Sequence, residues 1–255
     1  MKNLTGKIAL ITGGSRGLGK NMAEQLSDHG TDIILTYNSN QEAAHAVVKS
    51  IEEKGGKAVA LQLNVGDTGS FSVFFEQVAA ALQANWGRDT FDFLINNAGV
   101  GAHVPIAATE EETFDNLMNI HFKGTYFMVQ RSIPLLAEGG RVINISTGLA
   151  RFSLPGYAAY ASMKGGVETF TRYVAAELGA KRITANIVAP GAIETDFTKP
   201  AFEAFPGMRE QLAQSTALGR VGVPDDIGGV VAFLCSEEGR WVNGQRIEVT
   251  GGVFL

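Results

Sequence analysis

Cysteine is almost absent from this sequence, since Cys235 is the only one in 255 residues. A single thiol can form neither an internal disulfide nor a site in which several thiolates hold a metal ion. Basic residues are also few: 21 Lys and Arg face 26 Asp and Glu, which gives a formal net charge of -5. Because there is no cationic surplus to attract phosphate groups, we expect no nucleic-acid partner.

Long apolar runs are missing as well. The first apolar run, residues 8–11, is far too short to span a membrane, and it leads into a glycine-rich turn rather than a cleavage site. His29, His45 and His103 stand without a neighbouring ligand, so we expect no metal site. These absences predict a cytoplasmic protein that does not associate with membranes.

The dominant pattern that is present is a short β-branched run followed by a longer stretch of helical periodicity. This alternation predicts the α/β class, with a doubly wound parallel sheet of about seven strands and helices on both faces. The expected strands are residues 7–12, 32–37, 57–63, 91–96, 141–146, 183–188 and 245–249. The expected helices are residues 17–29, 41–54, 70–85, 110–137 and 157–179, followed by one from Pro224 or Asp225 to Cys235.

No repeat, low-complexity tract or Pro/Ser-rich linker divides the chain, so we expect one domain over residues 1–255. Residues 191–222 interrupt the alternation after the sixth expected strand, and they carry Phe197, Pro200, Phe202, Phe205 and Pro206. A long excursion at the carboxyl end of a strand is typical of a substrate lid. The alternative is a helical hairpin that only packs against the domain.

A glycine-rich turn directly follows the first expected strand, where residues 12–19 read TGGSRGLG. Glycine permits positive φ and lets a pyrophosphate approach the backbone, while the amides at the start of the next helix can bind the anion. The turn lacks the Lys-Ser/Thr ending of a triphosphate-binding loop, which disfavours ATP hydrolysis. We predict a dinucleotide site formed by Gly13, Ser15, Arg16, Gly17, Leu18 and Gly19.

The end of the second expected strand bears on the choice of dinucleotide. An Asp or Glu there accepts hydrogen bonds from the ribose of NAD and repels the 2′-phosphate of NADP. Residues 35–40 read LTYNSN, without a carboxylate, and Arg16 with Asn38 and Ser39 can meet a phosphate. We therefore expect NADP(H) in preference to NAD(H). The alternative is that Arg16 is a solvated turn residue and that the choice of cofactor is loose.

Tyr160 and Lys164 stand four residues apart in the fifth expected helix, so their side chains share one face. A nearby ammonium, together with an oxidised nicotinamide, stabilises a phenolate. Lowering the tyrosine pKa from about 10 to about 7 requires roughly 4 kcal/mol. The pair by itself is weak evidence, because tyrosine and lysine at this spacing are often only a helix surface pair. Its weight comes from the surrounding motifs.

The motifs occur in a fixed order: TGGSRGLG at residues 12–19, NNAG at 96–99, Tyr160 with Lys164, and Pro190-Gly191 followed by Thr195. In this order and spacing the sequence resembles the short-chain dehydrogenase/reductase family over nearly the whole chain. The resemblance implies a single Rossmann-type domain in which Tyr160 is the general acid/base. It also implies that Lys164 binds the nicotinamide ribose and lowers the pKa of Tyr160.

The same resemblance implies further cofactor contacts. Asn64 and Val65 stand where the family usually has Asp-Val against the adenine. An Asn can still pair with the exocyclic amine through its carbonyl oxygen. The other implied cofactor residues are Asn97, Ala98, Gly99, Pro190, Gly191, Ile193 and Thr195.

Two further positions depart from the family pattern. Thr147 stands thirteen residues before Tyr160, where the family has its substrate-orienting serine, and Ser146 precedes it. We expect Thr147 to do this work, because neighbouring strand residues point to opposite faces. His121 stands where the family has an asparagine that anchors a proton-relay water. A core or interface histidine and a proton carrier remain open alternatives for it.

These observations predict an NADP(H)-dependent oxidoreductase, like the 3-oxoacyl reductases or carbonyl reductases of the family. It would transfer a hydride between the nicotinamide and a carbonyl or secondary alcohol of a small molecule. A carrier-protein substrate is disfavoured, because residues 136–141 read LAEGGR and residues 175–177 read AAE, without a basic docking patch. The alternatives are an NAD-linked sugar or polyol dehydrogenase and a non-catalytic dinucleotide-binding sensor. By analogy with the family we expect a homotetramer or a homodimer.

Overall fold

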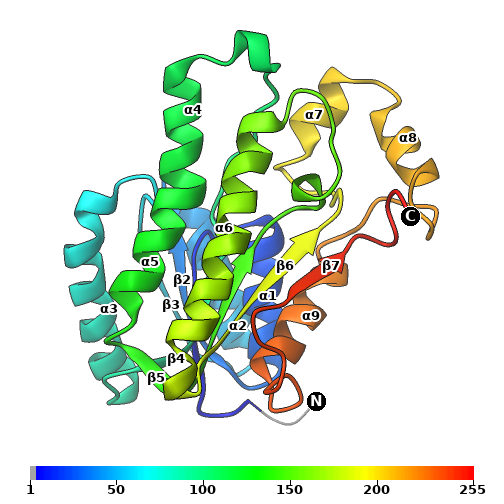
Figure 1. Cartoon of the computed structure of the whole chain (residues 1–255). Coiled ribbons are helices and arrows are strands. Elements are labelled where there is room, and N and C mark those ends of the chain that lie inside the picture. The colour runs from blue at the N-terminus through cyan, green and yellow to red at the C-terminus, as the bar shows by residue number, and fades with distance from the viewer. Residues whose placement is uncertain (1–3) are drawn as a thin grey trace.

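A computed structural model describes residues 4–255, which form one parallel sheet with the strand order β3-β2-β1-β4-β5-β6-β7 (Figure 1). The strands are β1 (Ile8–Ile11), β2 (Asp32–Tyr37), β3 (Ala58–Gln62), β4 (Phe91–Asn96), β5 (Leu136–Ile145), β6 (Thr184–Pro190) and β7 (Arg246–Val249). Every neighbouring pair of strands is parallel. The doubly wound α/β fold expected from the sequence is confirmed.

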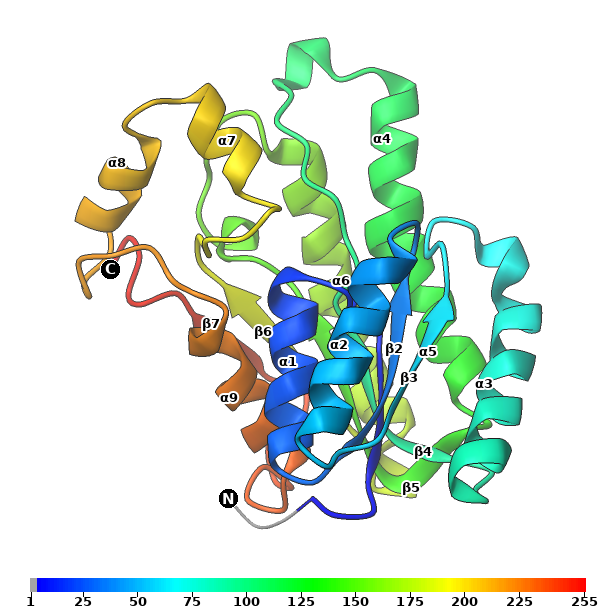
Figure 2. The same ribbon diagram turned by 180° about the vertical axis from the view of Figure 1, so that it is seen from behind.

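Helices cover both faces of the sheet (Figure 2). One face carries α1 (Gly17–Asp28), α2 (Gln41–Glu53) and α9 (Asp225–Cys235). The other carries α3 (Phe71–Trp86), α4 (Glu111–Leu117), α5 (Gly124–Ser132) and α6 (Ala158–Glu177). Within residues 4–255, no helix has both the length and the apolar character that crossing a membrane requires.

The two apolar cores explain why β1 reads as an uninterrupted apolar run. Ala9 and Ile11 belong to the core under α1, α2 and α9, whereas Ile8 and Leu10 belong to the core under α3 and α5. Because both faces of a parallel sheet are covered, alternate side chains are buried in opposite directions and no polar alternation appears.

The helix expected over residues 110–137 is wrong in its interior and at its end. It divides into α4, a π-helical stretch (Met118–Lys123) and α5, which ends at Ser132. β5 then begins at Leu136, five residues earlier than expected, because Leu136 pairs with Phe91 across a register shift. The two consecutive leucines at 135 and 136 fit a helix or a strand equally well, so the periodicity gave no boundary.

Residues 191–222 leave the sheet at the carboxyl end of β6 and contain two short helices, α7 (Lys199–Ala204) and α8 (Met208–Gln214). Figure 1 shows them above the end of the sheet where the strands point. The chain winds from β1 to β3 on one side and returns to β4 beside β1. Because the two crossovers diverge at such a switch point, the topology predicts a ligand-binding crevice at the carboxyl ends of β1 and β4.

Candidate active site

The turn between β1 and α1 presents free backbone amides to the crevice. α1 begins at Gly17, its N-cap Arg16 makes no side-chain capping bond, and its first turn holds no acidic residue. The first amides of the helix therefore keep their hydrogen-bonding capacity and the positive end of the helix dipole is uncompensated. This arrangement suits a diphosphate.

At two glycines of the turn there is no room for a side chain. Gly13 has a φ of +67°, and a Cβ placed on it would lie 2.9 Å from the Cα atom of Ala98. A Cβ on Gly19 would overlap the carbonyl oxygen of Gly13. The turn thus packs against the end of β4 and against itself in a way that only glycine allows. This narrow, bare cradle fits the pyrophosphate of a dinucleotide.

Thr12 and Asn97 lock this cradle to β4. The Oγ1 atom of Thr12 accepts hydrogen bonds from the amides of Asn97 and Ala98 at 3.0 and 3.1 Å. In return, Nδ2 of Asn97 donates to the carbonyls of Thr12 and Gly13 at 3.0 and 3.2 Å. Asn97, expected to line the cofactor, therefore has its amide group engaged in bracing the turn. The bracing role of Thr12 was not foreseen from the sequence.

The residues expected around the adenosine lie at the carboxyl ends of β2 and β3. Asn38 and Ser39 are exposed just beyond β2. Oδ1 of Asn64 accepts from the amide of Gly66 at 3.0 Å, so this oxygen, which was expected to meet the adenine, supports a local turn. Arg16 is 73% exposed and lies 3.9 Å from Asp196 at the start of the 191–222 segment. Its guanidinium is held weakly enough to turn towards an anion.

The segment after β6 closes over the same turn. A Cβ on Gly17 would lie 3.5 Å from the side chain of Thr195. Ile193 is buried and bridges to Gly222. Pro190 ends β6, and Gly191 follows it, donating its amide to the carbonyl of Val249. The structure thus brings this group of expected cofactor residues to the crevice from the far end of the chain.

Tyr160 and Lys164 lie one turn apart on α6, and both are buried. The Nζ atom of Lys164 donates a hydrogen bond to the carbonyl of Ile145 at 2.7 Å and stands 5.9 Å from the centre of the Tyr160 ring. The helical spacing seen in the sequence thus places both side chains against the end of β5, beside the crevice.

Burial dominates the titration of this pair. It raises the pKa of Tyr160 above that of a free phenol, and a hydrogen bond with Thr147 opposes the rise. Burial lowers the pKa of Lys164 to about 8, because the charged ammonium is removed from water. From the sequence, the phenol pKa is expected to fall towards 7 beside the ammonium and an oxidised nicotinamide. In the chain by itself, burial dominates, and the phenol stays protonated at neutral pH.

The hydroxyls of Ser146 and Thr147, just beyond the end of β5, contact different residues of α6. Oγ of Ser146 donates to Oε1 of Glu168 at 2.6 Å, away from the phenol. Thr147 faces Tyr160, and its Oγ1 atom also accepts from the amide of Leu149 at 3.3 Å. Of the two hydroxyls, that of Thr147 is the one beside Tyr160.

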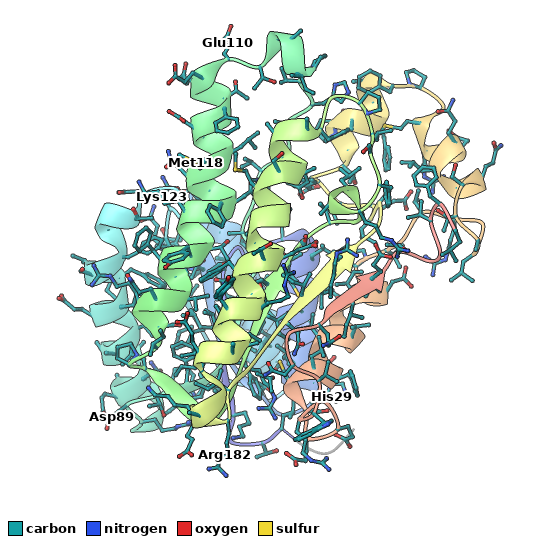
Figure 3. All side chains as sticks on the ribbon, in the orientation of Figure 1. His29, Asp89, Glu110, Met118, Lys123 and Arg182 are labelled. Atoms are coloured by element: carbon teal, nitrogen blue, oxygen red, sulfur yellow. The ribbon has the colours of Figure 1, made fainter. Side chains whose placement is uncertain are left out.

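His121 sits in the π-helical stretch, whose ends, Met118 and Lys123, are labelled in Figure 3. Its Nε2 atom bonds the carbonyl oxygen of Val100 at 2.8 Å, and Nδ1 is buried without a hydrogen-bond partner among residues 4–255. Burial, followed by the charge of Lys164, lowers the pKa of His121 to about 3. The imidazole is therefore neutral at physiological pH, which argues against a charged proton carrier.

Aromatic side chains from separate segments contact one another near Tyr160. The ring of His103 meets Tyr157 and Phe205 edge-on, at centre distances of 5.1 and 5.0 Å. Phe197 lies 6.2 Å from the ring of Tyr160. The contact made by His103 joins the loop after β4 to the 191–222 segment. Phe197 and Phe205 belong to the segment expected to form a lid, whereas the sequence offers His103 only as a metal ligand without a neighbouring partner.

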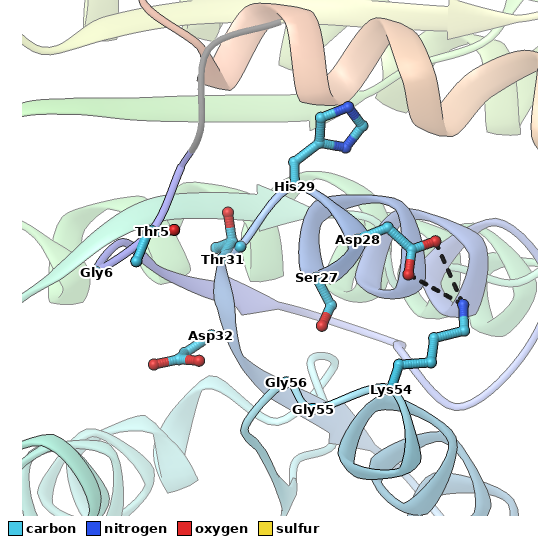
Figure 4. Close-up of a pocket in the computed structure, with 11 residues that line it drawn as sticks. Thr5, Gly6, Ser27, Asp28, His29, Thr31, Asp32, Lys54, Gly55 and Gly56 are labelled. Atoms are coloured by element: carbon cyan, nitrogen blue, oxygen red, sulfur yellow. Dashed lines mark hydrogen bonds and ion pairs between the residues drawn. The ribbon is translucent and has the colours of Figure 1, made fainter.

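A separate hollow of about 580 Å³ lies at the opposite end of the sheet, where the strands begin (Figure 4). It lies at the amino ends of β1, β2 and β3, and the Lys54–Asp28 ion pair at 3.1 Å closes one side of it. None of the expected site residues lines it. Among the described residues, no group of three or more His, Cys, Asp or Glu is arranged to hold a metal ion.

Comparison with known proteins agrees with this geometry. A family model described as "Enoyl-(Acyl carrier protein) reductase" matches residues 13–254. The chain belongs to the short-chain dehydrogenase/reductase family. The resemblance stated from the sequence motifs is therefore confirmed. Proteins similar to it are named reductases, and this chain is an oxidoreductase of the same family.

Three similar proteins illustrate the relationship. The hydroxynaphthalene reductase-like protein Arp2 of Metarhizium robertsii is 37% identical over 98% of this chain and 96% of its own length. The angucycline C-6 ketoreductase LanV, solved with bound NADP, is 39% identical with a TM-score of 0.94, covering 99% of this chain and 97% of that one. The reductase LugOII, described as promiscuous, is 36% identical with a TM-score of 0.94 and full coverage of both chains.

Proposed function

We propose that this family member is an NADPH-dependent ketoreductase acting on small planar aromatic ketones, with Tyr160 as the proton donor. The observation that carries the proposal is the buried Tyr160–Lys164 pair facing Thr147 beside a bare glycine cradle. A protonated phenol next to a hydroxyl suits the reduction of a carbonyl group, because the carbonyl oxygen gains a proton as it becomes an alcohol.

The residues of the crevice fit NADPH in the following way. The amides at the start of α1 would hold the diphosphate, and Arg16 with Asn38 and Ser39 would hold the 2′-phosphate. Lys164 would hold the nicotinamide ribose, and Ile193 with Thr195 the carboxamide side. Bound there, NADPH supplies a hydride to the carbonyl carbon. The absence of a carboxylate from residues 35–40 supports NADPH over NADH.

The chain's own residues handle the proton. Thr147 orients the substrate by donating a hydrogen bond from Oγ1 to the carbonyl oxygen. Tyr160 transfers its phenolic proton to that oxygen, and the nearby Lys164 ammonium stabilises the phenolate that remains. The neutral imidazole of His121 adds no competing positive charge to the site.

The aromatic wall supports the substrate class. His103, Tyr157, Phe197 and Phe205 present ring faces and edges, which favour contact with a flat aromatic molecule. The named relatives include a hydroxynaphthalene reductase-like protein and an angucycline ketoreductase, whose names describe fused-ring compounds. The segment 191–222 would then act as the lid that covers such a substrate.

A cofactor-oxidation assay tests this function. We expect wild-type protein to oxidise NADPH with fused-ring ketones such as tetralones more rapidly than with aliphatic ketones or sugars, and Tyr160→Phe to be inactive while still binding NADPH. Binding of NADPH without turnover of any carbonyl compound would favour the dinucleotide sensor. Tighter binding of NAD than of NADP, with oxidation of polyols, would favour the NAD-linked dehydrogenase.

We also propose that the protein forms a homotetramer or homodimer in the cytoplasm. Exposed aromatic side chains on several elements support an association between copies, among them Tyr126 on α5, Tyr173 on α6 and Trp241 before β7. Sedimentation equilibrium of the purified protein would give the number of chains directly.

A further inference from the structure

The last strand, β7, directs charged side chains towards α6, the helix that carries Tyr160 and Lys164. Ile247 and Val249 pack against the core on the α1 and α9 side. Arg246 and Glu248, which alternate with them, face the α6 side, where Arg246 meets Glu168. Figure 1 shows β7 at the edge of the sheet, next to β6. Arg246, from the edge strand, thus reaches the face of α6 that carries Glu168.

Arg246 makes a separate contact with each of its three nitrogens. Nε donates to Oε1 of Glu168 at 2.8 Å, and Nη1 pairs with Oε1 of Glu248 at 2.7 Å. Nη2 donates to the backbone carbonyl of Thr147 at 3.0 Å. Because the guanidinium is planar and rigid, these contacts fix the Thr147 carbonyl relative to two carboxylates.

Glu168 links the Arg246 guanidinium to α6. It follows Tyr160 and Lys164 at successive intervals of four residues, so all three lie along one face of α6. Its Oε1 atom accepts from Arg246 and also from Ser146, the residue before Thr147. The end of β5 is therefore tied to α6 both at Ser146 and, through Arg246, at Thr147.

Glu248 extends the network to the segment that follows Thr147. It pairs with Arg246 and also with Arg151, just beyond the short helical turn Gly148–Ala150. The network of Arg151, Arg246, Glu168 and Glu248 carries no net charge. The Arg246 side chain is 22% exposed, so its contacts are partly shielded from water.

We propose that Arg246 is a positioning residue for the reaction, holding the Thr147 backbone so that the Thr147 hydroxyl meets Tyr160 and the substrate oxygen. The proposal rests on the proposed function, in which Thr147 orients the carbonyl group. A different role for charges on an edge strand is to prevent other strands from adding to the sheet. If Arg246 only protects the sheet edge, replacing it leaves the turnover rate of the folded enzyme unchanged. If Arg246 positions Thr147, the turnover rate falls.

Kinetics of Arg246→Met and Arg246→Lys tests the positioning role. Lysine keeps the charge but lacks the rigid planar fork with which Arg246 donates to Glu168 and to the Thr147 carbonyl from separate nitrogens. We expect kcat with the ketone to fall about 10-fold in both variants, while KM for NADPH changes less than about twofold. Arg240→Met, which removes an exposed arginine paired with Glu237, is the matched control and should keep wild-type kcat. A wild-type kcat in folded Arg246→Lys would overturn the proposal.

A second measurement needs neither substrate nor cofactor. The methyl group of Thr147 can be followed by NMR in threonine-methyl-labelled protein and assigned through its loss in Thr147→Ser. We expect its order parameter to fall in Arg246→Lys and to stay at the wild-type value in Arg240→Met. An unchanged order parameter in Arg246→Lys would refute the clamp. If wild-type protein reduces no ketone, the proposed function fails, while this experiment still decides whether Arg246 holds Thr147.

Discussion

The imidazole of His121 stands edge-on to the phenol ring of Tyr160, with ring centres 5.0 Å apart and ring planes at 87°. The π-helical stretch between α4 and α5 carries His121 into this position, and the bond from Nε2 to the Val100 carbonyl holds it there. The contact buries a titratable ring beside the group proposed to donate the proton.

His121 should make the protein sensitive to acid. Its pKa is about 3 in the folded protein but about 6.5 in the unfolded chain, so between pH 6.5 and pH 3 the unfolded chain is the form that takes up the proton. Between pH 7 and pH 5, wild-type protein should lose about 2 kcal/mol more of its free energy of unfolding than His121→Asn. Urea denaturation at both pH values measures this difference. His45→Asn, at an exposed position, should follow wild type.

Lys164 should set the alkaline limit of reduction. Burial lowers the pKa of its ammonium to about 8, so the charge proposed to stabilise the phenolate is present below pH 8 and lost above it. We expect kcat/KM for the ketone to be level up to about pH 8 and then to fall by about 10-fold per pH unit. Lys164→Met should be nearly inactive at every pH. A wild-type profile that stays flat to pH 10 would contradict this assignment.

The bare backbone at Gly19 should be essential for binding the dinucleotide. A Cβ there overlaps the Gly13 carbonyl, so Gly19→Ala must distort the turn. We expect the Kd for NADPH to rise more than about 10-fold, together with a loss of roughly 1–3 kcal/mol in stability. Fluorescence titration and thermal unfolding give the two quantities. Gly229→Ala in α9, where a Cβ meets no atom within 4 Å, should bind normally and be up to about 1 kcal/mol more stable.

Arg16 should distinguish NADPH from NADH without contributing to stability. Its contact with Asp196 spans 3.9 Å between side chains that are 73% and 65% exposed, and such pairs stabilise proteins little. Arg16→Gln should raise KM for NADPH by about 10-fold, leave KM for NADH unchanged and leave Tm unchanged. Asp196→Asn is the control for the ion pair and should keep the preference for NADPH. Equal effects of Arg16→Gln on both cofactors would show that Arg16 does not read the 2′-phosphate.

Local sequence patterns were sufficient for most of the fold. The apolar run of β1 and the periodicity of α2 each reflect a neighbourhood of a few residues, and both elements lie where the sequence places them. The expected helix over 110–137 shows the limit of this reasoning. Its middle widens into a π-helical stretch, and its end becomes the start of β5, because Leu136 finds a partner in Phe91 of another strand.

Some features of the candidate site could likewise be predicted from the sequence, and others could not. The spacing of Tyr160 and Lys164 determines that they share a face of α6, because helix geometry is local. Strand alternation would send Ser146 and Thr147 to opposite faces, but both lie beyond β5, and their hydroxyls contact Glu168 and Tyr160 on the same helix. By contrast, the environment of His121 depends on Val100 and Tyr160, which come from a loop and another helix. The pKa of His121 therefore could not be inferred from its neighbours in the sequence.

The sequence by itself determined the alternating elements, the glycine cradle and the order of the motifs, because each depends on conformational preferences and spacing within a short segment. Only the tertiary structure decided that Thr12 braces the amides of Asn97 and Ala98, and that Arg246 reaches the carbonyl of Thr147, 99 residues away in the chain. Such contacts depend on which strands become neighbours and in what register, and those choices are made by the packing of the whole sheet and its two cores.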